Sequence, residues 1–143
     1  MNLKPLVVIP TYNESLNIEK LLESLSDYFE KINVLFIDDN SPDKTGEIIK
    51  RFIQNNNNIN IITRPKKLGI GSAHLDGILW AYQNHYDHVV TMDSDLTHSP
   101  ELIIPYLNEI EKYDVIIGSR FMNSSSLKGW SFHRLILTHF GHL

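Results

Sequence analysis

The sequence of 143 residues contains no cysteine. This absence excludes disulfide bonds, zinc–thiolate sites and catalysis by a thiol. No apolar run approaches the length of a membrane-spanning helix, and the run at residues 6–9 is too short for a signal peptide. Basic residues are fewer than acidic ones: the sequence has 13 Lys and Arg and 17 Asp and Glu, which gives a formal net charge of −4. This balance argues against nucleic-acid binding by bulk electrostatics.

Two common nucleotide-binding motifs are also missing. The sequence has no Walker A motif, Gly-x-x-x-x-Gly-Lys, which disfavours a P-loop ATPase. Gly69 and Gly71 lack the spacing of a dinucleotide fingerprint and follow the third expected strand instead of the first, so an NAD site is not expected. With 42% hydrophobic and 21% charged residues, the composition is that of an ordinary soluble globular chain, and the length predicts one domain over residues 1–143.

What the sequence does contain is a regular alternation of strand and helix patterns. Short apolar runs predict five buried strands, and amphipathic spacing between them predicts helices. Such alternation is typical of right-handed βαβ units in a parallel sheet. We therefore expect an α/β, Rossmann-like fold with a central, mostly parallel sheet flanked by helices. The strands are expected at residues 6–9, 33–37, 59–63, 89–92 and 115–117, and the helices at 18–29, 48–53, 73–82 and from Pro100 onward.

The start of the last of these helices has its own signals. Ser99 and Pro100 are typical of an N-cap and a first helical residue. Pro105 lies inside the helix and predicts a kink or an early 3₁₀ turn. His98 is interpreted as a polar residue that precedes the cap.

The segments that follow the strands are rich in charged and hydrogen-bonding side chains. In a parallel sheet these loops emerge at one edge, where open α/β sheets bind ligands. Asp93 and Asp95 repel each other unless a cation or donor lies between them, and their oxygens suit Mg²⁺ or Mn²⁺. Glycines at a helix start, with Lys and Arg, suit phosphates. Together these loops, at residues 10–14, 38–43, 64–71, 93–95 and 118–120, predict a site for a nucleoside diphosphate and a divalent ion.

Several of these residues also have a plainer interpretation. Alone, Asp93 and Asp95 would be read as a solvated loop before a helix cap, but the other loops at the same edge favour the metal site. Asp38 is also explained by capping the turn that follows it. Lys66 and Lys67 are either a solvated basic turn or phosphate ligands, and both alternatives stay open.

The chain carries five motifs in order: VIPTYNE at 8–14, IDDNSPDKT at 37–45, RPKKLGIGSA at 64–73, MDSDL at 92–96 and GSRF at 118–121. They resemble family 2 glycosyltransferases with a GT-A fold, and more closely the dolichol-phosphate or polyprenol-phosphate mannosyltransferase group. Gly129-Trp130 followed by Arg134 supports that subgroup. Asn40 and Lys44 depart from the pattern, because the family usually has glycines there; asparagine tolerates left-handed conformations.

The resemblance implies inverting transfer of mannose from GDP-mannose to a dolichyl or polyprenyl phosphate. Asp93 and Asp95 would bind Mg²⁺ or Mn²⁺ together with the diphosphate, with Thr97 at the position of a further ligand. Asp95 is the expected most critical ligand and, with Arg120, the catalytic group. Arg120 would meet phosphate of the donor or the acceptor, and Arg134 would face the lipid phosphate. The residues expected to hold the donor nucleotide are Pro10, Tyr12, Glu14, Ile37, Asp39, Asp93 and Ser94.

The resemblance also implies a location and an extent. A nucleotide-sugar donor and a polyprenyl-phosphate acceptor imply a cytoplasmic protein, peripheral on the cytoplasmic face of the membrane, with no nucleic-acid partner; the oligomeric state is not indicated. Relatives continue past the region that matches Leu143. Residues 1–143 are therefore expected to be a single GT-A domain that represents the N-terminal, donor-binding part and is incomplete at its C-terminus.

Three alternatives accompany this prediction. One is a polyprenyl-phosphate glucosyl- or N-acetylglucosaminyltransferase that uses a UDP-sugar. A second is a truncated, non-catalytic remnant that binds a nucleotide sugar, which the short chain favours. The third takes Asp38 and Asp39 as the acidic pocket of a phospho-receiver domain. It is disfavoured because the next strand ends in Thr63-Arg64 and not in a phosphorylatable Asp.

Overall fold

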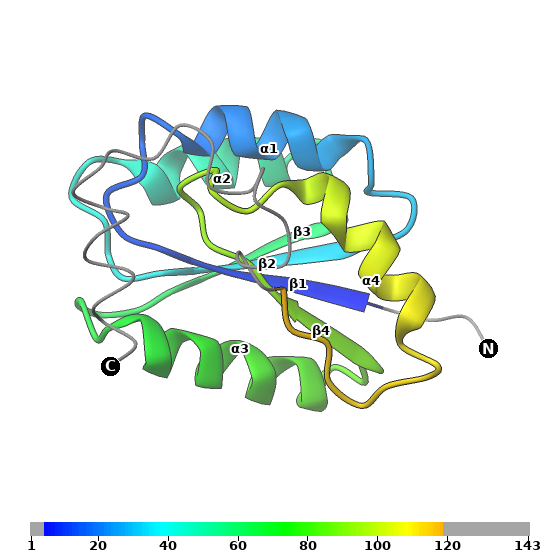
Figure 1. Cartoon of the computed structure of the whole chain (residues 1–143). Coiled ribbons are helices and arrows are strands. Elements are labelled where there is room, and N and C mark those ends of the chain that lie inside the picture. Colours follow the sequence, from blue (N-terminus) through cyan, green and yellow to red (C-terminus); the bar gives the residue numbers. More distant parts are fainter. Residues whose placement is uncertain (1–4, 119–143) are drawn as a thin grey trace, which may run out of the picture. The chain divides into compact units, whose positions relative to one another are not determined.

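The computed structural model describes residues 5–118 (Figure 1). The chain divides into two units, Met1–Asn108 and Glu109–Leu143, and the sheet belongs to the first. Four parallel strands form this sheet in the order β3-β2-β1-β4, which confirms the α/β fold and four of the five predicted strands. The strands are β1 (Pro5–Thr11), β2 (Asn33–Asp38), β3 (Ile59–Thr63) and β4 (His88–Thr91).

Helices cover both faces of the sheet (Figure 1). On the central strand β1, Val7 and Ile9 pack into the core that three helices share on one face. Leu6 and Val8 pack on the opposite face, under α3. All four residues are fully buried, which is why residues 6–9 are apolar on both faces of the strand. The three helices on the first face are α1 (Ile18–Ser26), α2 (Thr45–Ile53) and α4 (Ile103–Glu109), and α3 is Ile70–Gln83.

Helix α3 approaches β1 closely. A Cβ built on Gly77 would lie 2.3 Å from Val8 Cγ1, so a larger residue would not fit there. Ala73, Gly77 and Ala81 stand on successive turns and are the buried residues of this helix. The predicted helix is confirmed, but Ile78, whose spacing helped to predict it, is 47% exposed. The small side chains face the sheet because only they allow the close approach.

The last described helix begins with a 3₁₀ turn, η1 (Pro100–Leu102), which leads into α4. Pro105 is the third residue of α4, where a backbone N–H has no partner within the helix and its absence costs little. The early 3₁₀ turn is therefore confirmed. Ser99 and Pro100 occupy the N-cap and first helical positions as predicted, although the Ser99 side chain makes no capping hydrogen bond.

The fifth predicted strand is not formed. Residues 115–118 have no regular secondary structure, and Val115 and Ile117 are 75% and 81% exposed. A β-branched composition favours a strand but does not by itself form one, because a strand also needs a neighbour that supplies ladder hydrogen bonds. The prediction for residues 115–117 is wrong for this reason. None of the helices within residues 5–118 has the length and apolar character needed to span a membrane.

Candidate functional site

A pocket of about 370 Å³ lies where β1, β2 and β4 end. Open parallel sheets bind their ligands at this edge, and the volume suits a small molecule. The pocket brings together Asp95 and every residue predicted to hold the donor nucleotide, although the individual roles stay predictions. Those residues are Pro10, Tyr12, Glu14, Ile37, Asp39, Asp93 and Ser94.

A further wall of the pocket comes from the loop after β3 and the start of α3. It is lined by Lys67, Gly69, Ile70 and Ala73. Gly69 is the N-cap of α3 and has a φ of 94°, which side chains rarely adopt. The Lys67 ammonium lies 4.0 Å from the centroid of the Tyr12 ring. Lys67 is therefore part of the pocket wall, which decides against a purely solvated turn at this position.

The loop after β1 is tied to the loop after β2 by backbone N–H groups. The Glu14 amide donates to Thr45 Oγ1 and the Ser15 amide to Asp43 Oδ2, both at 2.9 Å. Burial raises the pKa of Asp43, but hydrogen bonds from Thr45 and Ser15 outweigh it and lower this pKa from 3.8 to about 2. The ionised carboxylate therefore fixes the loop that carries Tyr12 and Glu14.

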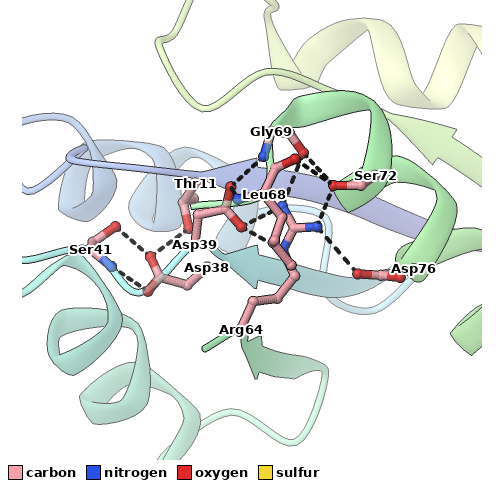
Figure 2. Close-up of polar contacts among 9 residues, drawn as sticks. All are labelled: Thr11, Asp38, Asp39, Ser41, Arg64, Leu68, Gly69, Ser72 and Asp76. Atoms are coloured by element: carbon pink, nitrogen blue, oxygen red, sulfur yellow. Dashed lines mark hydrogen bonds and ion pairs between the residues drawn. The ribbon is translucent and has the colours of Figure 1, made fainter. Parts of the chain in front are cut away.

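Asp38 makes hydrogen bonds within the protein and is not part of the pocket wall. It is 2% exposed and does not line the pocket. Its Oδ1 accepts hydrogen bonds from Thr11 Oγ1 at 3.0 Å and Ser41 Oγ at 2.6 Å, and its Oδ2 accepts from the Ser41 amide at 3.0 Å (Figure 2). Of its two interpretations, the structure bears out the capping of the following turn.

Asp39 lines the pocket and forms a buried ion pair with Arg64, which follows β3 (Figure 2). The Asp39 and Arg64 side chains are 7% and 3% exposed. Asp39 Oδ1 meets Nε and Nη2 of Arg64, and Oδ2 accepts from the amides of Leu68 and Gly69, each at 3.0 Å. A carboxylate offers about four hydrogen-bond acceptor sites, and these donors from the chain itself occupy those of Asp39.

Arg64 joins three elements and is the residue that sequence reasoning missed. Its Nη1 donates to Ser72 Oγ at 2.7 Å and Asp76 Oδ2 at 3.3 Å, and its Nη2 donates to the Gly69 carbonyl at 3.0 Å. The guanidinium thus connects the end of β3 to Asp39 and to the first turns of α3 (Figure 2). Its place after a strand and at the start of the motif at 64–73 marked it in the sequence, but its ion-pair partner Asp39 lies 25 positions earlier and was not evident.

The loop after β4 is organised by its own hydrogen bonds. Asp95 Oδ1 accepts from the Thr97 amide at 3.0 Å and from Thr97 Oγ1 at 2.6 Å. The Asp93 amide donates to His98 Nδ1 at 3.1 Å. Leu96 adopts a φ of 64°, in the left-handed region, and packs against the core. These contacts hold Asp93 and Asp95 in the lining of the pocket.

Asp93 and Asp95 have the donor chemistry of a hard divalent ion. Mg²⁺ is usually held by one or two carboxylates together with substrate phosphates and water, and the two carboxylates of this loop fit that pattern. Across residues 5–118, no group of three or more His, Asp or Glu side chains is arranged to hold a metal ion by itself. Thr97 is not among the pocket-lining residues, and its hydroxyl donates to Asp95.

Three residues singled out in the sequence, Arg120, Trp130 and Arg134, lie outside the described residues. The contacts expected of Arg120 and Arg134 with phosphate therefore stay predictions. The single domain over residues 1–143 also stays a prediction.

Comparison with known proteins identifies the class to which this fold and site belong. Residues 6–142 match the family model described as glycosyl transferase family 2. Since the match covers nearly the whole chain, the protein belongs to glycosyltransferase family 2. The resemblance seen in the sequence motifs is thereby confirmed.

Three curated relatives narrow the comparison. The polyprenol monophosphomannose synthase of Mycolicibacterium smegmatis is 31% identical over 94% of this chain. The undecaprenyl-phosphate mannosyltransferase of Micrococcus luteus is 32% identical over 99%, and the dolichol-phosphate mannosyltransferase of Pyrococcus furiosus is 35% identical over 95%. The chain spans 52%, 58% and 38% of these relatives, respectively, which is about half of their length.

Solved structures share the fold. The mannosyltransferase PcManGT of Pyrobaculum calidifontis, in complex with GDP-Man and Mn²⁺, is 27% identical with a TM-score of 0.53, over 64% of this chain and 27% of that one. TarS 1–349 of S. aureus, in complex with UDP-GlcNAc, has a TM-score of 0.64 at 20% identity, over 85% of this chain and 39% of that one. At 20% identity, the likeness to TarS concerns the fold alone.

Proposed function

We propose that this chain forms the donor-binding part of an inverting mannosyltransferase that transfers mannose from GDP-mannose to a polyprenyl phosphate such as dolichyl phosphate. One observation carries the proposal. Tyr12, Asp39 and the carboxylates Asp93 and Asp95 line one pocket, in a chain 31–35% identical to three polyprenyl-phosphate mannosyltransferases. The shared names of these relatives favour mannose over glucose or N-acetylglucosamine.

The nucleoside and the diphosphate of the donor would bind to different residues, on two flanks of the pocket. Pro10, Ile37 and the Tyr12 ring offer apolar surface to the base, and Glu14 offers acceptors to the ribose hydroxyls. Asp93 and Asp95 would hold Mg²⁺ or Mn²⁺ together with the diphosphate. When bound, such an ion offsets the charge that develops on the leaving nucleoside diphosphate.

The acceptor supplies its own nucleophile. A phosphate monoester has a second pKa of about 6, so most of it is a dianion at pH 7 and needs no general base. An acceptor oxygen forms a bond to the anomeric carbon as the bond from that carbon to GDP breaks, on the opposite side, which inverts the centre. We assign Arg120 to the phosphate that meets this centre and Arg134 to the lipid phosphate. Because the acceptor is a lipid phosphate and the donor a nucleotide sugar, we also propose that the protein works at the cytoplasmic face of a membrane.

Calorimetry with GDP-mannose and UDP-glucose, each with and without Mn²⁺, tests donor binding. We expect GDP-mannose to bind more tightly than UDP-glucose and only in the presence of the metal ion. The double substitution Asp93→Ala with Asp95→Ala should abolish this binding. Binding that does not depend on the metal ion, or that survives the double substitution, would contradict the proposed metal bridge. Tighter binding of UDP-glucose would favour a UDP-sugar enzyme.

Transfer is tested separately, by incubating the chain with labelled GDP-mannose and vesicles that contain a polyprenyl phosphate. A labelled, lipid-extractable product that depends on Mn²⁺ and on Asp95 is expected. Metal-dependent donor binding without any such product would instead identify the chain as a non-catalytic, nucleotide-sugar-binding form.

A further inference from the structure

We infer that Lys67 is a specificity-determining residue that reads the base of the bound nucleotide, and that the buried Asp39–Arg64 pair positions it. This inference rests on the proposed function, because it assigns the diphosphate to the Asp93 side of the same pocket. It concerns the part of the pocket wall that would face the nucleoside. This part contains the cation of Lys67 and the aromatic ring of Tyr12.

Lys67 has an environment that suits a ligand-binding cation. Its ammonium lies 4.0 Å from the centroid of the Tyr12 ring, and both residues line the pocket. Throughout residues 5–118, no carboxylate forms an ion pair with Lys67. The face of an aromatic ring attracts a cation without consuming its hydrogen-bond donors. The Lys67 donors are therefore available to a ligand that stacks beside Tyr12.

The backbone on both sides of Lys67 is fixed before any ligand binds. On one side, the Arg64 amide donates to the Asp38 carbonyl at 2.8 Å, and the Arg64 side chain is buried against Asp39. On the other side, the amides of Leu68 and Gly69 donate to Asp39 Oδ2 (Figure 2). A short turn between two anchors leaves little freedom, so the lysine stem starts from a defined place. Asp39, with its acceptor sites filled, serves here as the anchor.

The strand order places this turn away from the diphosphate side. Lys67 lies on the loop after β3, and Asp93 lies on the loop after β4. These strands are the two edges of the sheet, and three inter-strand spacings separate them, roughly 14 Å. A diphosphate held at Asp93 and Asp95 therefore leaves the base, and not the phosphates, beside Tyr12 and Lys67.

The ammonium group of Lys67 should prefer some nucleotide bases over others. Lys67 can only donate hydrogen bonds, so it favours base edges that carry acceptors. Guanine presents two acceptors, O6 and N7, and uracil presents O4, whereas adenine presents its N7 acceptor beside a donating amino group at N6. Lys67 is therefore expected to favour bases with an oxo group, and guanine, with two adjacent acceptors, most of all.

The experiment measures dissociation constants of GDP, UDP and ADP, each with Mn²⁺, for the unaltered chain and for Lys67→Met, Lys67→Arg and Lys66→Met. We expect Lys67→Met to reduce the preference for GDP over ADP by about tenfold, and Lys67→Arg to retain most of it. Lys66→Met removes the same charge from a neighbour that does not line the pocket, and should leave the preference unchanged. Arg64→Lys should weaken the preference in the same direction as Lys67→Met.

Three results would overturn the inference while leaving the proposed function intact. The preference for GDP could be unchanged in Lys67→Met, or all three nucleotides could weaken by the same factor, as expected of a phosphate contact. Equal effects of Lys66→Met and Lys67→Met would indicate only a general loss of positive charge. By contrast, failure of the unaltered chain to bind any of the nucleotides would overturn the proposed function, and this inference with it.

Discussion

Asp39 and Arg64, 25 positions apart in the sequence, form a buried ion pair that joins the end of β2 to the end of β3. Removing one member leaves the other charge buried without a partner. We expect Arg64→Ala to lower the free energy of unfolding by about 3–5 kcal/mol. Urea unfolding followed by circular dichroism measures the change.

The matched control is Arg51→Ala. Arg51 lies 4.0 Å from Glu19 with both side chains more than 60% exposed, so its loss should cost less than about 1 kcal/mol. An equal effect of the two substitutions would contradict the importance assigned to the buried pair.

Gly77 gives a second prediction, because it lets α3 approach β1. Gly77→Ala would place a Cβ 2.3 Å from Val8 Cγ1 and should destabilise the protein by about 1–3 kcal/mol. Gly71→Ala, in the first turn of the same helix, meets no atom within 4 Å and should be neutral or stabilise by up to about 1 kcal/mol. Thermal unfolding of both variants checks the contrast. Equal stabilisation of the two variants would mean that helix propensity, and not the contact with Val8, governs position 77.

Lys44 gives a third prediction, because its φ of 72° places a non-glycine residue in the left-handed region. Lys44→Gly relieves this strain, although it also increases the freedom of the unfolded chain, so we expect a gain of about 0.5–1 kcal/mol. Lys50→Gly, in the last turn of α2, should instead cost up to about 1 kcal/mol. Chemical unfolding of the two variants measures the difference in sign, and a loss of stability in Lys44→Gly would contradict the argument.

The pH dependence of stability provides a fourth prediction. Since hydrogen bonds lower the pKa of Asp43 to about 2, the ionised carboxylate stabilises the folded state at every pH above the value of the unfolded chain, near 3.8. This contribution is lost as the pH falls from about 4 towards 2. Asp43→Asn should therefore be less stable at neutral pH and show a smaller loss in that window, measured by urea unfolding at several pH values. Asp27→Asn, on an exposed residue at the end of α1, should keep the full loss; a full loss in Asp43→Asn would count against the assignment.

Local patterns in the sequence were sufficient to predict the sheet and the edge that binds ligands. Residues 6–9 are apolar on both faces of their strand, which only a sheet covered on both sides requires. Asp93 and Asp95 follow a strand directly, so strand order alone brings them to the pocket. The glycines usual in the family at positions 40 and 44 correspond to left-handed backbone here, with φ of 56° at Asn40 and 72° at Lys44.

Features that depend on distant partners were not predictable in the same way. Arg64 could not be recognised as a central residue, because its role depends on Asp39 and on the first turns of α3. The buried face of α3 was not evident from the sequence, because Gly77, and not the size of the apolar residues, decides which side meets the sheet. Residues 115–117 had the composition of a strand, but composition does not supply a partner for the ladder.

The two flanks of the pocket differ in how they are held. The wall around Lys67 is anchored by a buried ion pair between residues distant in the sequence, whereas the loop with Asp93 and Asp95 relies largely on bonds between near neighbours in sequence. Backbone that is already ordered loses little entropy when a ligand arrives. Leu68 and Gly69 amides should therefore exchange hydrogen slowly even in the free protein, whereas the Thr97 amide should gain protection mainly on ligand binding.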